Sequence, residues 1–157
     1  MDPNTMMTHY MQLLATNQPW NLLIFMAIPV ILAECIAVTE LFILLGRNLT
    51  SGIKKLNRVA GIAVGIYFTG IFLYLLVTAF IPITANGQWR GLSDLIAVSA
   101  YLFGVVPLGG IALLELGVIG KEKTAEEKLK LHVTFVALFL VVAHIAMIFG
   151  MLDPRIL

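Results

Sequence analysis

The stretch ILAECIAVTELFILL, residues 31–45, is almost entirely apolar but contains two glutamates, Glu34 and Glu40. The apolar run around it extends from Leu22 to Leu45, which is long enough for a helix to cross about 30 Å of hydrocarbon. Ionisable side chains at that depth are costly and are usually found where they face other protein groups. The segment therefore predicts a membrane helix whose carboxyl groups point into a protein interior.

The composition of the chain also indicates a membrane protein. Of the 157 residues, 60% are hydrophobic and only 12% are charged, whereas a soluble domain has about 25% charged residues. One small core cannot bury so much apolar surface, so we expect lipid to surround the chain. A formal net charge of +1 gives no sign of nucleic-acid binding, and the single cysteine, Cys35, excludes an intramolecular disulfide.

Four apolar segments are each about 20–25 residues long and can span a bilayer as helices. They cover approximately residues 22–45, 59–83, 95–119 and 132–152. The connections between them are short, which favours helices that alternate in direction. The sequence therefore predicts an all-α membrane protein, a single transmembrane domain over residues 1–157 with four helices in an up-down-up-down bundle.

Lysine and arginine are distributed unevenly over the predicted connections. Most of the ten basic residues follow the first and third spans: Arg47, Lys54, Lys55, Arg58, Lys121, Lys123, Lys128 and Lys130. The other side has only Arg90 and Arg155. By the positive-inside rule, the basic connections face the cytoplasm and both termini lie outside, with residues 1–20 as an external interfacial segment.

The two halves of the sequence share a weak pattern. TELFILLG (39–46) and LNRVAGIAV (56–64) flank the first basic connection, as LLELGVIG (113–120) and LKLHVTFVA (129–137) flank the second. Glu40 then matches Glu115, and Asn57 matches His132. The pattern is typical of two parallel helical hairpins related by an axis along the membrane normal, although chance similarity explains identity this low equally well.

Depths estimated from a helical rise of about 1.5 Å per residue place the polar residues in two layers. Glu40, Glu115 and His132 form an inner layer, where they either make a cytoplasmic mouth or simply reach headgroups and loop lysines. Glu34, Cys35 and His144 form a middle layer. Glu34 and His144 lie about 18 Å and about 12 Å from the outer edge, so we expect them to share a hydrogen bond or an ion, or to form a purely structural polar pair.

Carboxylates and imidazoles together suit divalent metal ions such as zinc, iron or manganese, and they also suit proton relay. We therefore expect a non-enzymatic membrane protein that binds a metal cation or protons. In a stronger form of the hypothesis, it also passes them across the membrane. The predicted ligands are Glu34 and His144 at a central site and Glu40, Glu115 and His132 at the mouth. Side chains six or twelve residues apart do not share a helix face, so each layer must be assembled between different helices.

Two other functions remain open on the sequence alone. A b-type haem is held by histidines on different helices, but His132 and His144 lie in the same span, so haem requires an interface between two protomers, with Met26 or Met147 as further ligands. In the third hypothesis the chain is an accessory subunit whose buried charges pair with the helices of a larger complex. We expect a homo-oligomer or a partner membrane protein, and no nucleic acid.

The segment MMTHYMQLLA, residues 6–15, has two interpretations. Met6, Met7, His9 and Met11 are candidate ligands for copper(I) or haem iron. Alternatively, the segment is a short interfacial helix followed by Trp20 as an aromatic anchor, with an apolar stripe formed by Met7, Tyr10, Met11 and Leu14. The spacing favours the helix.

Prolines and glycines predict irregularities in the spans. Pro29 frees the carbonyl of Phe25 and Pro107 frees that of Phe103, and such carbonyls either line an ion path or serve packing. The G-x-x-x-G pattern of Gly61 and Gly65 favours a close helix approach, within the chain or in a dimer.

Three stretches, NQPWNLLIFMAIPVILAE (17–34), LLELGVIG (113–120) and VVAHIAMIFGMLDP (141–154), resemble a family of small, uncharacterised four-span inner-membrane proteins of bacteria that are often labelled permease. The resemblance covers nearly the whole chain, and its motifs contain Glu34, Glu115 and His144. It implies a multi-pass protein of the bacterial inner membrane, but it implies no particular mechanism.

Overall fold

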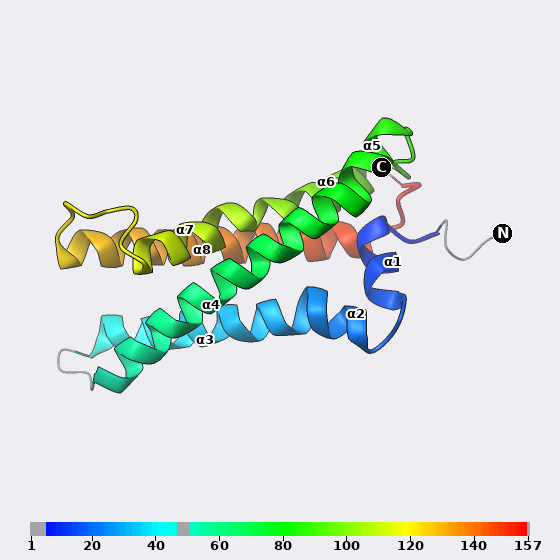
Figure 1. Ribbon diagram of the computed structural model, residues 1–157. Helices are drawn as coiled ribbons and strands as arrows, with labels where there is room; N and C mark the ends of the chain where they lie inside the picture. Colours follow the sequence, from blue (N-terminus) through cyan, green and yellow to red (C-terminus); the bar gives the residue numbers. More distant parts are fainter. Residues whose placement is uncertain (1–5, 47–50, 157) are drawn as a thin grey trace.

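Long apolar helices make up most of the described chain, residues 6–46 and 51–156, in a computed structural model (Figure 1). Four of them are long and apolar enough to cross a membrane: Trp20–Leu45, Gly52–Ala85, Leu92–Glu115 and Ala125–Met151. No strand occurs within these two described ranges. The all-α class is therefore confirmed, and these four helices are candidates for the predicted spans.

The helices follow one another along the chain with few residues between them. In order they are α1 (His9–Ala15), α2 (Trp20–Leu22), the π-helix η2 (Leu23–Ala27), α3 (Ile28–Leu45), α4 (Ser51–Leu75), the π-helix η3 (Leu76–Phe80), α5 (Ile81–Ala85), α6 (Leu92–Phe103), α7 (Val105–Glu115) and α8 (Ala125–Met151). Helix α1 and the C-terminus lie at one end of the long helices, and the α7–α8 connection lies at the other (Figure 1).

Two helix ends differ from the predicted ones for local reasons. Helix α8 begins at Ala125, seven residues before the predicted start, because Thr124 and Glu127 form a capping box: the Thr124 N–H donates to Glu127 Oε2 (2.8 Å) and the Glu127 N–H donates to Thr124 Oγ1 (3.3 Å). Helix α7 ends at Glu115 instead of residue 119, because Gly117 takes a φ of +72° and closes the helix in a Schellman motif. Because α8 begins at Ala125, His132 lies about two turns inside this helix.

The two π-helices explain how the first two spans accommodate proline. Each ends one residue before an Ile–Pro pair, Ile28–Pro29 and Ile81–Pro82. Proline lacks the N–H and clashes with the carbonyl four residues earlier, and the wider turn relieves both problems. The predicted free carbonyl of Phe25 is present, and it accepts a hydrogen bond of 2.5 Å from the Tyr101 hydroxyl.

The third span is interrupted where the sequence predicts weakness. Helices α6 and α7 meet at Gly104, three residues before Pro107. Glycine at this position has a packing reason as well, since a Cβ atom there would lie 3.2 Å from the Phe68 ring. The break therefore lies where the Phe68 ring of α4 packs against the third span.

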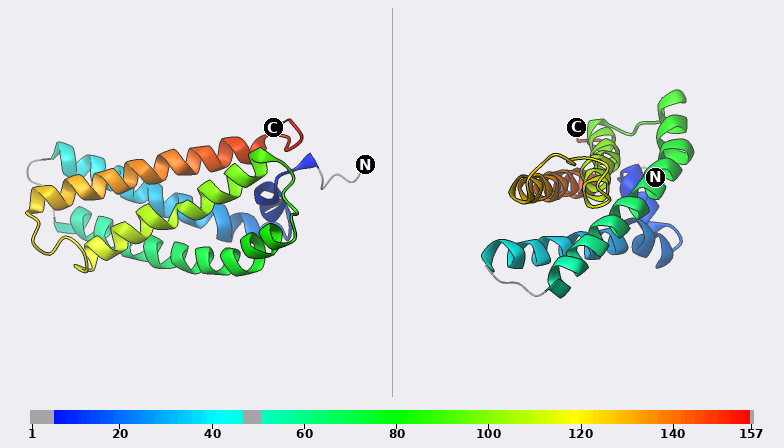
Figure 2. Two further views of the ribbon diagram at one scale, coloured as in Figure 1. Left: turned by 90° about the horizontal axis from the view of Figure 1, so that it is seen from above. Right: turned by 60° about the vertical axis from the view of Figure 1, so that its left-hand side comes forward.

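The G-x-x-x-G pattern in α4 packs inside the chain. A Cβ atom at Gly65 would lie 2.4 Å from the Ala112 Cβ, and one at Gly61 would lie 2.8 Å from Ile111 Cγ2. Both neighbours belong to α7, so the two small residues let α4 and α7 approach closely. Helix α8 lies alongside α6 and α7, whereas α3 packs mainly against α4 (Figure 2). The sequence left open whether this pattern packs within the chain or in a dimer, and the structure shows a contact within the chain.

Candidate functional site

One polar side chain from each of four helices meets near the end of the bundle that carries the α7–α8 connection. These residues are Glu40 from α3, Asn57 from α4, Glu115 from α7 and His132 from α8, and we call them the polar cluster. The three residues of the predicted inner layer are thus brought together. Asn57, which the sequence suggested only as the counterpart of His132 in the repeat pattern, is the fourth member.

His132 lies between the two carboxyl groups. Its Nδ1 is 2.7 Å from Glu40 Oε2, and its Nε2 is 3.5 Å from Glu115 Oε1. The side chains of His132 and Glu40 are only 4% and 5% exposed, whereas that of Glu115 is 23% exposed. Neither ring contact has the alignment of a full hydrogen bond, and Glu40 Oε1 is buried with no hydrogen-bond partner among the residues that the structure describes. The cluster is therefore deeply buried at Glu40 and reachable at Glu115.

Asn57 holds Glu40 in place. Its side-chain amide donates to Glu40 Oε2 at 3.1 Å, to Thr39 Oγ1 at 2.8 Å and to the Ile36 carbonyl at 3.2 Å. All three acceptors belong to α3, so the amide also fixes α4 against α3. Because Asn57 is itself buried, this arrangement keeps the carboxylate oriented towards His132.

A cavity of about 320 Å³ connects the polar cluster to the surface. Three cationic side chains line it, those of Lys54 and Arg58 from α4 and Lys128 from α8. Arg58 donates to the Glu115 carbonyl at 3.2 Å, and its Nε lies 3.8 Å from Glu115 Oε2. The buried carboxylates are thus reached through a positively charged entrance.

The geometry of the polar cluster does not suit a metal ion. The two carboxylates approach different nitrogens of the same imidazole ring, which point away from each other, so one ion cannot bind a ring nitrogen and both carboxylates. In the part of the chain that the structure describes, no group of three or more His, Cys, Asp or Glu side chains converges on a metal position. The predicted metal set of Glu34, His144, Glu40, Glu115 and His132 is therefore not supported.

The predicted central pair is also not formed as a direct contact. Glu34 and His144 line the same cleft and are both exposed in the single chain. Within the described residues no hydrogen bond or ion pair joins them, and the His144 Nδ1 instead contacts the Leu140 carbonyl at 2.6 Å. Cys35 does not line the cleft and packs against the core. Glu34 and His144 thus line one cleft, as their estimated depths suggested, but they do not form the predicted pair.

A buried carboxylate at the opposite end was missed by the sequence analysis. Asp94, in the first turn of α6, is completely buried. It accepts hydrogen bonds from the His9 N–H (2.6 Å) and the Arg90 N–H (3.2 Å), and it lies 2.6 Å from His9 Nδ1. Arg90 also donates to the Met7 carbonyl (2.6 Å) and to Gln12 Oε1. Asp94 and Arg90 together hold α1 across this end of the bundle.

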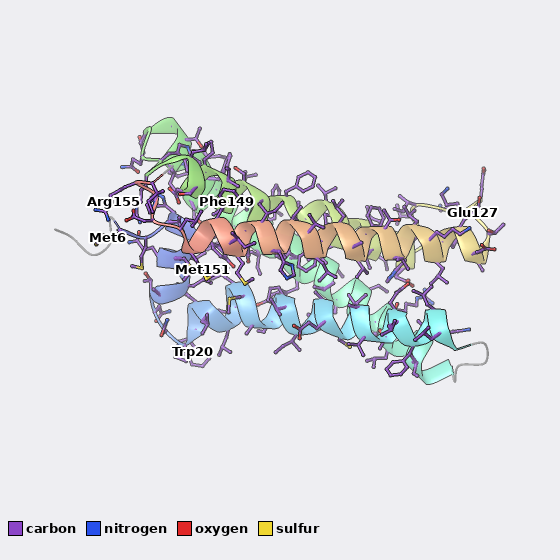
Figure 3. All side chains as sticks on the ribbon, turned by 180° about the vertical axis from the view of Figure 1, so that it is seen from behind. Met6, Trp20, Glu127, Phe149, Met151 and Arg155 are labelled. Carbon is purple, nitrogen blue, oxygen red and sulfur yellow. The ribbon has the colours of Figure 1, made fainter. Side chains whose placement is uncertain are left out.

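The N-terminal segment is the short helix that its spacing favoured. Tyr10 and Leu14 are buried, and Met11 packs against the core. Burial raises the pKa of Tyr10 to about 12. Of the candidate ligands in this segment, His9 is engaged by Asp94 and Met6 is 46% exposed. Met6 and Trp20 lie at the α1 end of the molecule and Glu127 at the other (Figure 3).

The sequence matches one known family, described as a family of unknown function (DUF6803), over residues 5–157. No curated protein matches the chain. No solved structure matches it either. The family description names no activity, so it supports neither the permease label nor the bacterial origin that the resemblance implied.

Proposed function

The chain belongs to DUF6803, a family of unknown function, and from that premise we propose that it is an integral multi-pass membrane protein that binds a proton at the polar cluster. The observation that carries the proposal is the position of His132 between two carboxyl groups, one buried and one reachable from the basic end. Imidazole and carboxyl groups exchange protons near neutral pH, and buried groups of this kind in membrane spans are typical of proton-handling sites.

The order of the groups supports a short relay. With one ring proton on Nδ1 facing Glu40, the lone pair of His132 Nε2 faces Glu115 at 3.5 Å. A proton taken up by Glu115 from the cavity can pass to Nε2 and leave His132 as an imidazolium between two carboxylates. Asn57 keeps Glu40 aimed at the ring throughout.

The surroundings favour a proton over a metal cation. Lys54, Arg58 and Lys128 line the entrance, and their charges disfavour the entry of a divalent ion. Beyond the polar cluster, the same face of α4 continues with Val64 and Phe68, which are buried in the apolar core. We therefore propose binding and exchange at one end of the bundle, without passage across it.

The basic connections and the matching residues of the two halves also support an arrangement of the chain in the membrane. We propose an up-down-up-down bundle of two duplicated hairpins with the basic connections in the cytoplasm and both termini outside. The matching positions support the duplication, since Asn57 donates to Glu40 in the first hairpin and His132 lies 3.5 Å from Glu115 in the second. The polar cluster would then exchange protons with the cytoplasm.

Reporter fusions test the orientation. Fusions after Ser51 and after Ala125 should report the cytoplasm, and fusions at Gly87 and at the C-terminus should report the outside, because the basic connections remain on the cytoplasmic side. Activity of paired reporters that work only on one side of the membrane measures this directly. An external signal from either basic connection would contradict the orientation.

Proton uptake tests the polar cluster. After a downward pH jump, protein in lipid nanodiscs should take up one proton more than the His132→Gln variant, as measured with a pH-indicator dye. Glu115→Gln should slow uptake by about a hundredfold, a typical effect of losing a positioned proton carrier.

Glu126→Gln is the matched control, since Glu126 lies at the same end of the bundle but is exposed and pairs with Lys130. It should leave uptake unchanged. If His132→Gln and Glu115→Gln fold and take up protons as the unaltered chain does, the polar cluster is only structural.

A further inference from the structure

An apolar cleft of about 530 Å³ lies on the side of the bundle, between α3 on one side and α6 and α8 on the other. Its volume is in the range of small-molecule sites, about 300–1,000 Å³. Its lining includes the aromatic rings of Phe25, Phe68, Tyr101 and Phe139. Its lining also includes exposed residues of the membrane spans such as Val30, Ile31 and Met147. A ligand would therefore enter from the bilayer.

His144 presents a hydrogen-bond acceptor to this cleft. Its Nδ1 lies 2.6 Å from the Leu140 carbonyl oxygen, which can only accept, so Nδ1 carries the ring proton. In the neutral ring the Nε2 lone pair is then left to accept from a ligand. No other polar contact of His144 occurs within the described ranges 6–46 and 51–156.

Glu34 is the second polar group at the cleft. It makes no hydrogen bond or ion pair with any residue that the structure describes, and it lies about 18 Å along the span from Leu22. A carboxyl group at that depth needs a polar partner. No lysine or arginine lines the cleft, so a ligand that carries a hydrogen-bond donor would supply such a partner.

We propose that the cleft binds a lipid-soluble quinol, a flat dihydroxylated ring on an apolar tail. One ring hydroxyl donates to His144 Nε2 and the other to the Glu34 carboxyl group. The ring packs against the aromatic walls, and the tail leaves through the open side into lipid. This inference does not depend on the proposed proton site, because the two sites share no residue.

Other membrane ligands fit these groups less well. The oxidised quinone has only acceptors, so it leaves the His144 lone pair without a donor. Haem brings two anionic propionates into a cleft that has the Glu34 carboxyl group and no cationic side chain. A phospholipid keeps its charged headgroup at the membrane surface, away from the depth of Glu34.

Retention of ligand by protein in phosphatidylcholine nanodiscs tests the proposal. The probes are a short-tailed benzoquinol under anaerobic reducing conditions and its ring dimethyl ether, which has the same ring and tail but a methyl group in place of each donor hydrogen. Compared with empty nanodiscs, the protein should retain about one quinol per chain and prefer it over the ether by at least about tenfold, as sites built around a hydrogen bond do.

Two variants separate the site from general affinity for apolar ligands. His144→Phe keeps an aromatic ring in the cleft but removes the acceptor, and Glu34→Leu removes the carboxyl group without adding a polar atom. Both should abolish the preference for quinol. Ile148→Phe adds a ring to exposed α8 surface outside the cleft and should retain the preference.

Three results would overturn the quinol site. One is equal retention of quinol and ether by the unaltered chain. Another is an unchanged preference in folded His144→Phe and Glu34→Leu variants. The third is a Soret band in the purified protein that disappears in His144→Phe, which would make iron porphyrin the occupant.

Discussion

Replacing Asp94 with alanine should detach α1 from the bundle and lower the free energy of unfolding by about 3–5 kcal/mol, the usual effect of removing one member of a buried polar pair. The side chain is completely buried and accepts from the backbone N–H groups of His9 and Arg90. Alanine leaves these donors and the His9 ring without their acceptor. Hydrogen exchange over His9–Ala15 should rise to the rate of an unprotected segment.

Ser93 provides a matched control one residue away. It is also completely buried, but its hydroxyl has no hydrogen-bond partner among the described residues. Ser93→Ala removes an unsatisfied polar group, so its stability should be unchanged or slightly higher. If both variants leave the exchange of α1 equally slow, Asp94 does not hold that helix.

Replacing Gly65 with alanine should force α4 and α7 apart and lower the free energy of unfolding by about 2–3 kcal/mol, as overpacking does. The new Cβ would lie 2.4 Å from the Ala112 Cβ and 2.6 Å from the Leu108 carbonyl oxygen, and backbone atoms cannot give way as a flexible side chain can. Denaturant unfolding in mixed micelles measures the loss.

Gly70 on the same helix serves as the comparison. Nothing lies within 4 Å of a Cβ built there, so Gly70→Ala should raise stability by up to about 1 kcal/mol through helix propensity alone. Equal stability of the two alanine variants would show that α4 and α7 do not approach as closely as described.

The sequence predicted the four long apolar helices well because hydropathy reports where apolar residues run continuously over the length of a helix. It predicted helix ends less well, because local capping groups and positive-φ glycines, rather than hydropathy, decide where a helix begins and ends. The start of α8 is set by Thr124 and Glu127, which lie outside any apolar run. Asp94 was missed for a related reason: it is polar and was placed just before a span, although it is buried there by α1.

Depth along a helix was sufficient to predict the polar cluster in part. Glu40, Glu115 and His132 were placed at one level, and short connections between helices keep residues at equal depth near one another. Depth does not fix rotation about the helix axis, which decides whether two side chains meet. Glu34 and His144 consequently reach the same cleft without touching, and the partner of Glu40 from α4, Asn57, was not expected at the site.

The π-helical turns have a consequence for comparing this chain with its relatives. A π-turn accommodates one residue more than an α-turn, so it is the structural form of a single-residue insertion, and one residue rotates a helix by about 100°. Deleting one residue from Leu23–Ala27 would therefore turn Trp20 relative to Glu34 and Glu40 while leaving both glutamates in their sites. In an alignment of relatives, a one-residue gap within residues 23–27 together with loss of Pro29 would be compatible with the same polar cluster. A gap between Glu34 and Glu40 would not, because it would rotate the two glutamates relative to each other.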